Sequence, residues 1–74
     1  MKLDEILKAI RKELNISQEQ LARDLNVSYT TLNRWENSRT KASRLAKVAM
    51  IDYCKQNRMS PELIEAIEES VKTK

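Results

Sequence analysis

The chain has 74 residues and a net charge of +3, with no glycine, no histidine, one proline and one cysteine. A chain of this length forms one small domain at most, so we expect a single unit over residues 1–74. A lone cysteine excludes an intrachain disulfide, and one thiol without histidine argues against a zinc site, so no metal or other cofactor is expected.

Helix-forming residues dominate the composition, and no window alternates between apolar and polar residues as a half-buried strand does. These observations predict an all-α fold. No apolar run approaches the roughly 18 residues of a membrane span, and no signal peptide is recognisable. We therefore expect a cytoplasmic protein that makes no membrane contact.

Two amphipathic helices are expected at the start of the chain. The first runs from about Leu3 to Leu14, where apolar residues recur at steps of three and four. The second runs from Gln18 to about Leu25, with Ser17 as its N-cap. Its inward-facing residues are Leu21, Ala22 and Leu25.

The next few residues must form a sharp turn, because another helical pattern starts almost at once. Asn26 fits this turn, since Asn tolerates the left-handed conformation better than any residue except Gly. Ser28 is a good N-cap for a third helix from about Tyr29 to Asn37. This helix has two unlike faces: Leu32 and Trp35 turn to the core, and the other face carries Tyr29, Thr30, Asn33, Arg34 and Asn37.

Two further helices are expected after a loop. The fourth runs from about Ser43 to Gln56, and the fifth starts at Pro61, with Ser60 as N-cap, and ends near residue 72. The fourth helix is expected to be well buried because of a wide apolar arc made of Leu45, Ala46, Ala49, Met50, Tyr53 and Cys54. The fifth combines an apolar face with four glutamates.

The charges are unevenly distributed along the chain. Residues 1–27 have a net charge of 0, residues 28–58 of +5 and residues 59–74 of −2. The positive segment begins with the third helix, and such asymmetry indicates an anionic partner. The alternative for a charge cluster taken alone is a solvated helix face.

The segment from Gln18 to Asn37 meets the requirements of a helix-turn-helix unit. Such a unit needs apolar residues where its helices touch, a small residue at their closest approach and a tight turn. The small residue is Ala22 and the turn residue is Asn26, and the apolar contacts come from Leu21, Leu25, Val27, Leu32 and Trp35.

The stretch LNISQEQLARDLNVSYTTLNRWENSRTK resembles the helix-turn-helix domain of the phage-repressor-like (Cro/C1, XRE) family. The resemblance covers about residues 5–57, and SQEQLA, LNVS and RWEN are its most specific parts. It implies a compact, five-helix, lambda-repressor-like domain whose third helix enters the major groove of double-stranded DNA.

The resemblance also implies roles for individual residues. The base-reading positions are Tyr29, Thr30, Asn33 and Arg34. The positions that contact phosphate are Gln18, Ser28, Asn37, Arg39 and Lys41. The family buries a structural ion pair where this chain has Arg11 and Glu36. The side chains themselves agree, because Arg can read guanine, Asn can read adenine and a Thr methyl can touch thymine.

Two positions depart from the family pattern, which usually has Gly where Asn26 stands and often where Ser38 stands. Asn accepts positive φ, but Ser does so less well. We therefore expect the loop that carries Arg39 and Lys41 to differ at Ser38.

These observations predict a sequence-specific DNA-binding protein, a small repressor-like transcriptional regulator that binds two half-sites as a homodimer. One alternative is an antitoxin or adaptor that binds a protein partner through the C-terminal helix. Others are a DNA-targeting component of a restriction-modification or mobile-element system, and a helical interaction module without a DNA role. No enzyme is expected, because there is no histidine, no Gly-rich phosphate loop and no nucleophile beside a plausible base.

Overall fold

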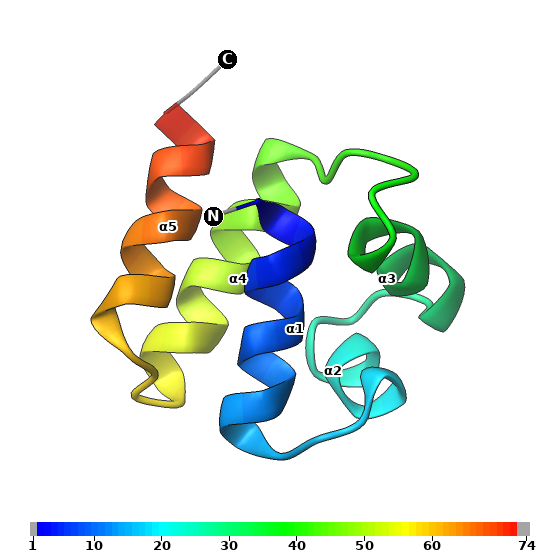
Figure 1. Cartoon of the computed structure of the whole chain (residues 1–74), viewed down its shortest axis with the longest axis horizontal. Helices are drawn as coiled ribbons and strands as arrows, with labels where there is room; N and C mark the ends of the chain where they lie inside the picture. Colours follow the sequence, from blue (N-terminus) through cyan, green and yellow to red (C-terminus); the bar gives the residue numbers. More distant parts are fainter. Residues whose placement is uncertain (1, 73–74) are drawn as a thin grey trace.

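The computed structural model describes residues 2–72, and this part of the chain contains five helices (Figure 1). They are α1 (Leu3–Leu14), α2 (Gln18–Asp24), α3 (Tyr29–Glu36), α4 (Arg44–Gln56) and α5 (Pro61–Lys72). No strand occurs among these residues, so the all-α prediction is confirmed. Each predicted helix lies within one residue of its expected bounds.

Serine hydroxyls start three of the helices. Ser17, Ser28 and Ser43 each accept a hydrogen bond from the backbone N–H three residues later, at 3.0, 3.0 and 3.1 Å. Each bond satisfies one of the N–H groups that have no partner within the first turn of a helix. The predicted caps at Ser17 and Ser28 are thus confirmed.

The first four helices all end in the same kind of turn. A residue with positive φ follows each of them: Asn15 (55°), Asn26 (60°), Ser38 (57°) and Arg58 (52°). The next N–H then donates to the carbonyl five positions back, at 2.9–3.0 Å, as in a Schellman motif. Without glycine, the chain uses polar residues for this conformation. The predicted turn at Asn26 is confirmed, and Ser38 keeps the positive φ that we expected it to disfavour.

One apolar core joins all five helices, and α1 lies between α5 and the α2–α3 pair (Figure 1). Helix α4 packs side by side with α5. Trp35 and Cys54 are buried, as the sequence predicts. The buried apolar residues are Ile6, Leu7, Ile10, Leu21, Ala22, Leu32, Trp35, Ala42, Met50, Cys54, Met59, Leu63 and Ile67.

Helix α4 is less buried than its composition predicts, and this expectation was wrong. Met50 and Cys54 are buried, but Leu45 is 81% exposed and Ala49 is also exposed. The apolar arc of α4 is wider than the surface its neighbours cover. The core therefore takes up only one side of the arc, and Leu45 remains on the other side.

Candidate nucleic-acid interface

Helices α2 and α3 form the helix-turn-helix unit, held together by apolar contacts. Leu21 and Ala22 of α2 and Leu32 of α3 are all buried in the common core. The left-handed turn at Asn26 reverses the chain within a few residues, and Ser28 then starts α3. The Ser28 hydroxyl accepts from the Thr31 N–H and donates to the Thr31 hydroxyl at 2.8 Å. This local network fixes where α3 begins.

The polar face of α3 is open to solvent. Tyr29 is 52% exposed, Thr30 and Arg34 are exposed, and Asn33 is partly buried. Burial of Trp35 on the opposite side orients the helix, because a large apolar side chain in the core fixes which face is left outside. The structure thus brings together the four side chains that were predicted to read bases.

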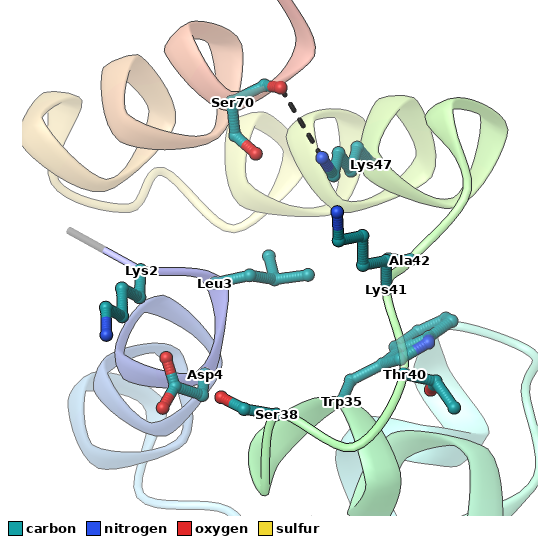
Figure 2. A pocket seen from close by; sticks show the side chains of 10 residues that line it. All are labelled: Lys2, Leu3, Asp4, Trp35, Ser38, Thr40, Lys41, Ala42, Lys47 and Ser70. Carbon is teal, nitrogen blue, oxygen red and sulfur yellow. Dashed lines mark hydrogen bonds between the residues drawn. The ribbon is translucent and has the colours of Figure 1, made fainter. Parts of the chain in front are cut away.

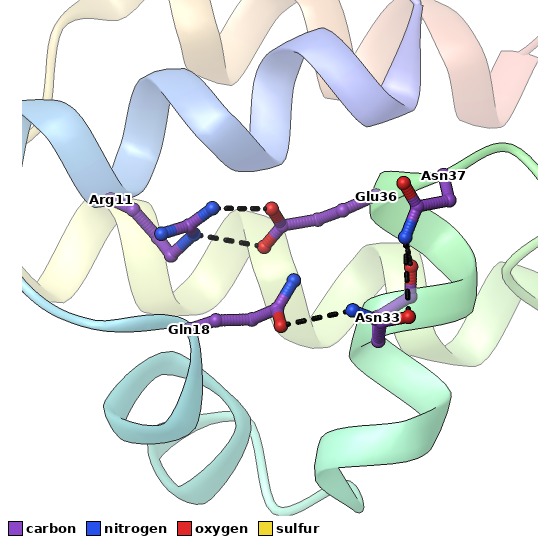
Figure 3. A network of polar contacts seen from close by, with 5 residues as sticks. All are labelled: Arg11, Gln18, Asn33, Glu36 and Asn37. Carbon is purple, nitrogen blue, oxygen red and sulfur yellow. Dashed lines mark hydrogen bonds and ion pairs between the residues drawn. The ribbon is translucent and has the colours of Figure 1, made fainter.

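An amide network connects α2 with the end of α3 (Figure 3). Asn33 Nδ2 donates to Gln18 Oε1 at 3.2 Å. Asn37 Nδ2 donates to the backbone carbonyl of Asn33 at 2.8 Å and to Asn33 Oδ1 at 3.2 Å. Both ends of the Asn33 amide are therefore engaged within the protein, which holds its side chain in one orientation.

The turn after α3 differs from the other three in the residue that follows it. The turns after α1, α2 and α4 are followed by Ile16, Val27 and Met59, which pack against or within the core. An apolar contact of this kind usually accompanies the motif. After α3 the corresponding residue is Arg39, which is exposed. This turn therefore places a cation on the surface where the others place an apolar side chain.

Four cations lie from α3 to the start of α4 along the chain and have no ion pair in the described part of the structure. Among the described residues, Arg34, Arg39, Lys41 and Arg44 are exposed and form no ion pair. By contrast, Arg11 and Arg23 are each paired with a glutamate. The charges of Arg34, Arg39 and Lys41 are thus available to an external anion.

The loop between α3 and α4 lies over a depression of about 470 Å³ (Figure 2). Its wall includes Trp35, Ser38 and Lys41, together with Asp4 from the first turn of α1. Figure 2 shows the Ser38 hydroxyl beside the Asp4 carboxylate. Burial alone would raise the pKa of Asp4, but the neighbouring Ser38 hydroxyl, backbone N–H groups and the charge of Lys8 outweigh this effect, and the pKa is lowered.

The contact between Asp4 and Ser38 was not predicted from the sequence. The two residues are far apart along the chain, and only the packing of α1 against α3 brings them together. No pattern in the sequence could have indicated the contact between Asp4 and Ser38. For the amide network, the i, i+4 spacing of Asn33 and Asn37 was a usable signal.

An ion pair fixes α3 to α1. Arg11 Nη2 donates to Glu36 Oε1 at 2.6 Å, and Arg11 Nε donates to Glu36 Oε2 at 3.0 Å (Figure 3). The Glu36 side chain is 2% exposed and that of Arg11 is 28% exposed. The two parallel bonds satisfy a buried carboxylate and restrict how α3 sits on α1.

The five-helix fold with its α2–α3 unit is that of a helix-turn-helix DNA-binding protein. A profile of the helix-turn-helix family matches residues 7–50, which is more than half of the chain. The chain belongs to the Cro/C1-type (XRE) helix-turn-helix family. Searches of curated proteins and of solved structures returned no match. No helix within residues 2–72 has the length and apolar character that crossing a bilayer requires.

Proposed function

We propose that this chain is a sequence-specific transcriptional regulator of the repressor type that inserts α3 into the major groove of double-stranded DNA. Tyr29, Thr30, Asn33 and Arg34 read base edges. The backbone phosphates are contacted by Gln18, Ser28, Asn37, Arg39 and Lys41. Base contacts then supply specificity, and phosphate contacts supply salt-dependent affinity and register.

The observation that carries this proposal is the exposed polar face of α3 with unpaired cations at its end. A surface that only solvates the protein has no need to concentrate a net charge of +5 in residues 28–58, or to place Arg39 where the other turns have an apolar residue. The amide network adds a second reason. A side chain already oriented by Gln18 and Asn37 loses less conformational freedom when Asn33 binds a base.

The test begins with selection of bound duplexes from a random pool, which yields the site and its symmetry. Binding of the selected duplex is then compared with binding of variants mutated at single base pairs. Arg34→Ala is expected to weaken binding to the selected site by about 5–150-fold, which corresponds to about 1–3 kcal/mol, and to relax discrimination at one position. Equal weakening on every duplex would contradict base reading by Arg34.

A second variant tests the phosphate contacts. Lys41→Ala is expected to weaken binding to all duplexes alike and to lower the slope of log K against log salt by about 1. Lys12→Ala, which removes an exposed cation from the last turn of α1, is the matched control and should leave the slope unchanged. An unchanged slope for Lys41→Ala would remove Lys41 from the phosphate contacts.

Two copies are expected to act together on DNA. One recognition helix reads only a few base pairs. A dimer with twofold symmetry reads a palindromic site whose half-sites are one helical turn apart. A selected site without such symmetry would argue for a monomer. Repression itself is tested by placing the selected site over a promoter and measuring transcription with and without the protein.

A protein partner is the second candidate, and the acidic surface of α5 favours it. Glu62 and Glu65 are exposed there, in a part of the chain with a net charge of −2. An antitoxin or adaptor would use this helix to bind a basic protein surface. Stoichiometric co-purification of one protein, lost on Glu62→Lys/Glu65→Lys, would support this candidate. A DNA-targeting subunit of a restriction-modification or mobile-element system would bind DNA through the same face of α3, and is a variant of the DNA-binding proposal.

A further inference from the structure

The outward side of α4 exposes apolar side chains at helical spacing. Leu45 is 81% exposed, Val48 is 42% exposed, and Ala49 is exposed beside them. These positions are three and four residues apart, so they lie on one face of the helix. We call this face, with Arg44 and Asp52, the outer face of α4.

This face is unusual within the protein. Among residues 2–72 the only large apolar side chains that are exposed are Tyr29, Leu45 and Val48. Tyr29 belongs to the polar face of α3, so the other two stand together on α4. Single exposed apolar residues are ordinary, whereas neighbouring exposed apolar residues on one helix face are typical of interaction surfaces.

The charges beside the apolar residues are complementary to each other. Arg44 lies one turn before Val48 and Asp52 lies one turn after it, and neither forms an ion pair among the described residues. They are about 12 Å apart along the helix, too far to pair within one chain. An antiparallel copy of α4, related by a twofold axis at Val48, brings each Arg44 level with the other copy's Asp52.

We infer that the outer face of α4 is the contact between two copies of this chain, with Leu45, Val48 and Ala49 at its centre and two Arg44–Asp52 pairs across it. Such a contact is isologous, as closed dimers require. This inference rests on the proposed function, because it names the surface through which two DNA-bound copies meet. Helix α4 is only about 20 Å long, so the contact is small and the dimer is weak without DNA.

The experiment is sedimentation equilibrium of the full chain without DNA, from about 10 µM to about 1 mM. Wild-type protein is expected to show a monomer–dimer equilibrium in this range. Asp52→Arg and Arg44→Asp should each weaken dimerisation at least about tenfold, and the double variant Arg44→Asp/Asp52→Arg should restore it. Glu65→Arg, the same reversal at an exposed glutamate of α5, is the matched control and should have no effect.

Leu45→Glu tests the apolar centre and should abolish the dimer. Because Leu45 is exposed, this variant is expected to remain folded, which circular dichroism checks. A strict monomer at all concentrations would overturn the inference, and so would a dimer unaffected by both Leu45→Glu and Asp52→Arg. Binding of the Leu45→Glu variant to a single selected half-site separates the two proposals. If half-site binding is retained while the dimer is lost, DNA binding and the α4 dimer contact are both supported. If the wild-type protein dimerises but binds no duplex, the proposed function fails and the dimer contact stands.

Discussion

The ion pair between Arg11 and Glu36 predicts an asymmetric response to mutation. The Glu36 carboxylate is almost completely shielded from water, whereas Arg11 retains 28% of its side-chain exposure. Removing Arg11 therefore leaves a charge that cannot be hydrated without opening the structure. Removing the charge of Glu36 leaves an arginine that can turn toward solvent.

The expected losses in the free energy of unfolding follow from this difference in burial. Stripping the partner from a buried ion costs about 3–5 kcal/mol, so we expect that loss for Arg11→Met. Glu36→Gln keeps the shape and one acceptor, and its cost should be about 1–2 kcal/mol. The double variant Arg11→Met/Glu36→Met replaces both charges by apolar groups and should recover most of the stability lost in Arg11→Met.

Urea denaturation provides the measurement, with circular dichroism and the fluorescence of the single Trp35 as two probes. A domain of this length has a free energy of unfolding of about 4–11 kcal/mol. With a slope of about 1 kcal/mol per molar urea, Arg11→Met should lower the midpoint by about 3 M or more. If Glu36→Gln is more damaging than Arg11→Met, or if Arg11→Met costs under about 1 kcal/mol, the pair does not behave as a buried charge and its counterion.

Three further predictions concern single side chains. The Tyr53 hydroxyl donates to Asp24 Oδ2 at 2.8 Å, so Tyr53→Phe should cost about 1 kcal/mol. Burial, together with this bond to Asp24, raises the pKa of Tyr53 from 10.0 to about 12. Because the folded state favours the neutral phenol, the contribution of Tyr53 to stability is complete below pH 10 and is lost as the pH rises toward 12. Melting temperatures measured over this pH range should therefore fall in the wild-type protein, and this fall should be absent in Tyr53→Phe. Ser38→Gly relieves a backbone cost of about 1 kcal/mol at φ 57°, but it also removes the hydroxyl beside Asp4. The free energy of unfolding should therefore rise more when Ser38→Gly is made in the Asp4→Ala background than in the wild-type chain; equal gains in the two backgrounds would contradict a stabilising contact between Ser38 and Asp4. The Cys54 thiol is fully buried and burial raises its pKa to about 11, so a thiol reagent at neutral pH should label it only as fast as the chain unfolds.

Much of the fold could be predicted because the signals for it are local. The serine caps, the left-handed turn at Asn26 and the apolar stripes each involve residues within a few positions of one another. The two faces of α3 follow in the same way, since a helix separates Trp35 from Arg34 whatever surrounds it. These features placed the candidate interface on α3 before any tertiary contact was known.

The residues of the candidate site could be predicted from the sequence, but the hydrogen bonds between them could not. Helical periodicity showed that Asn33 faces outward. It did not show that Gln18, fifteen positions earlier, holds the Asn33 amide. A bond of this kind depends on the crossing of α2 and α3, which is set by core packing and not by the spacing of the two residues along the chain.

The sequence by itself determined the helices, their ends and the polar face of α3, because short-range hydrogen bonding and periodicity decide these features. The tertiary structure alone decided which apolar side chains the core leaves uncovered, and therefore that Leu45 and Val48 of α4 are exposed. It also decided that a serine can follow α3 at positive φ, with its hydroxyl beside Asp4 of α1. The physical reason is the same in both cases: periodicity assigns a residue to a face of its helix, but only the packing of the other helices determines what covers that face.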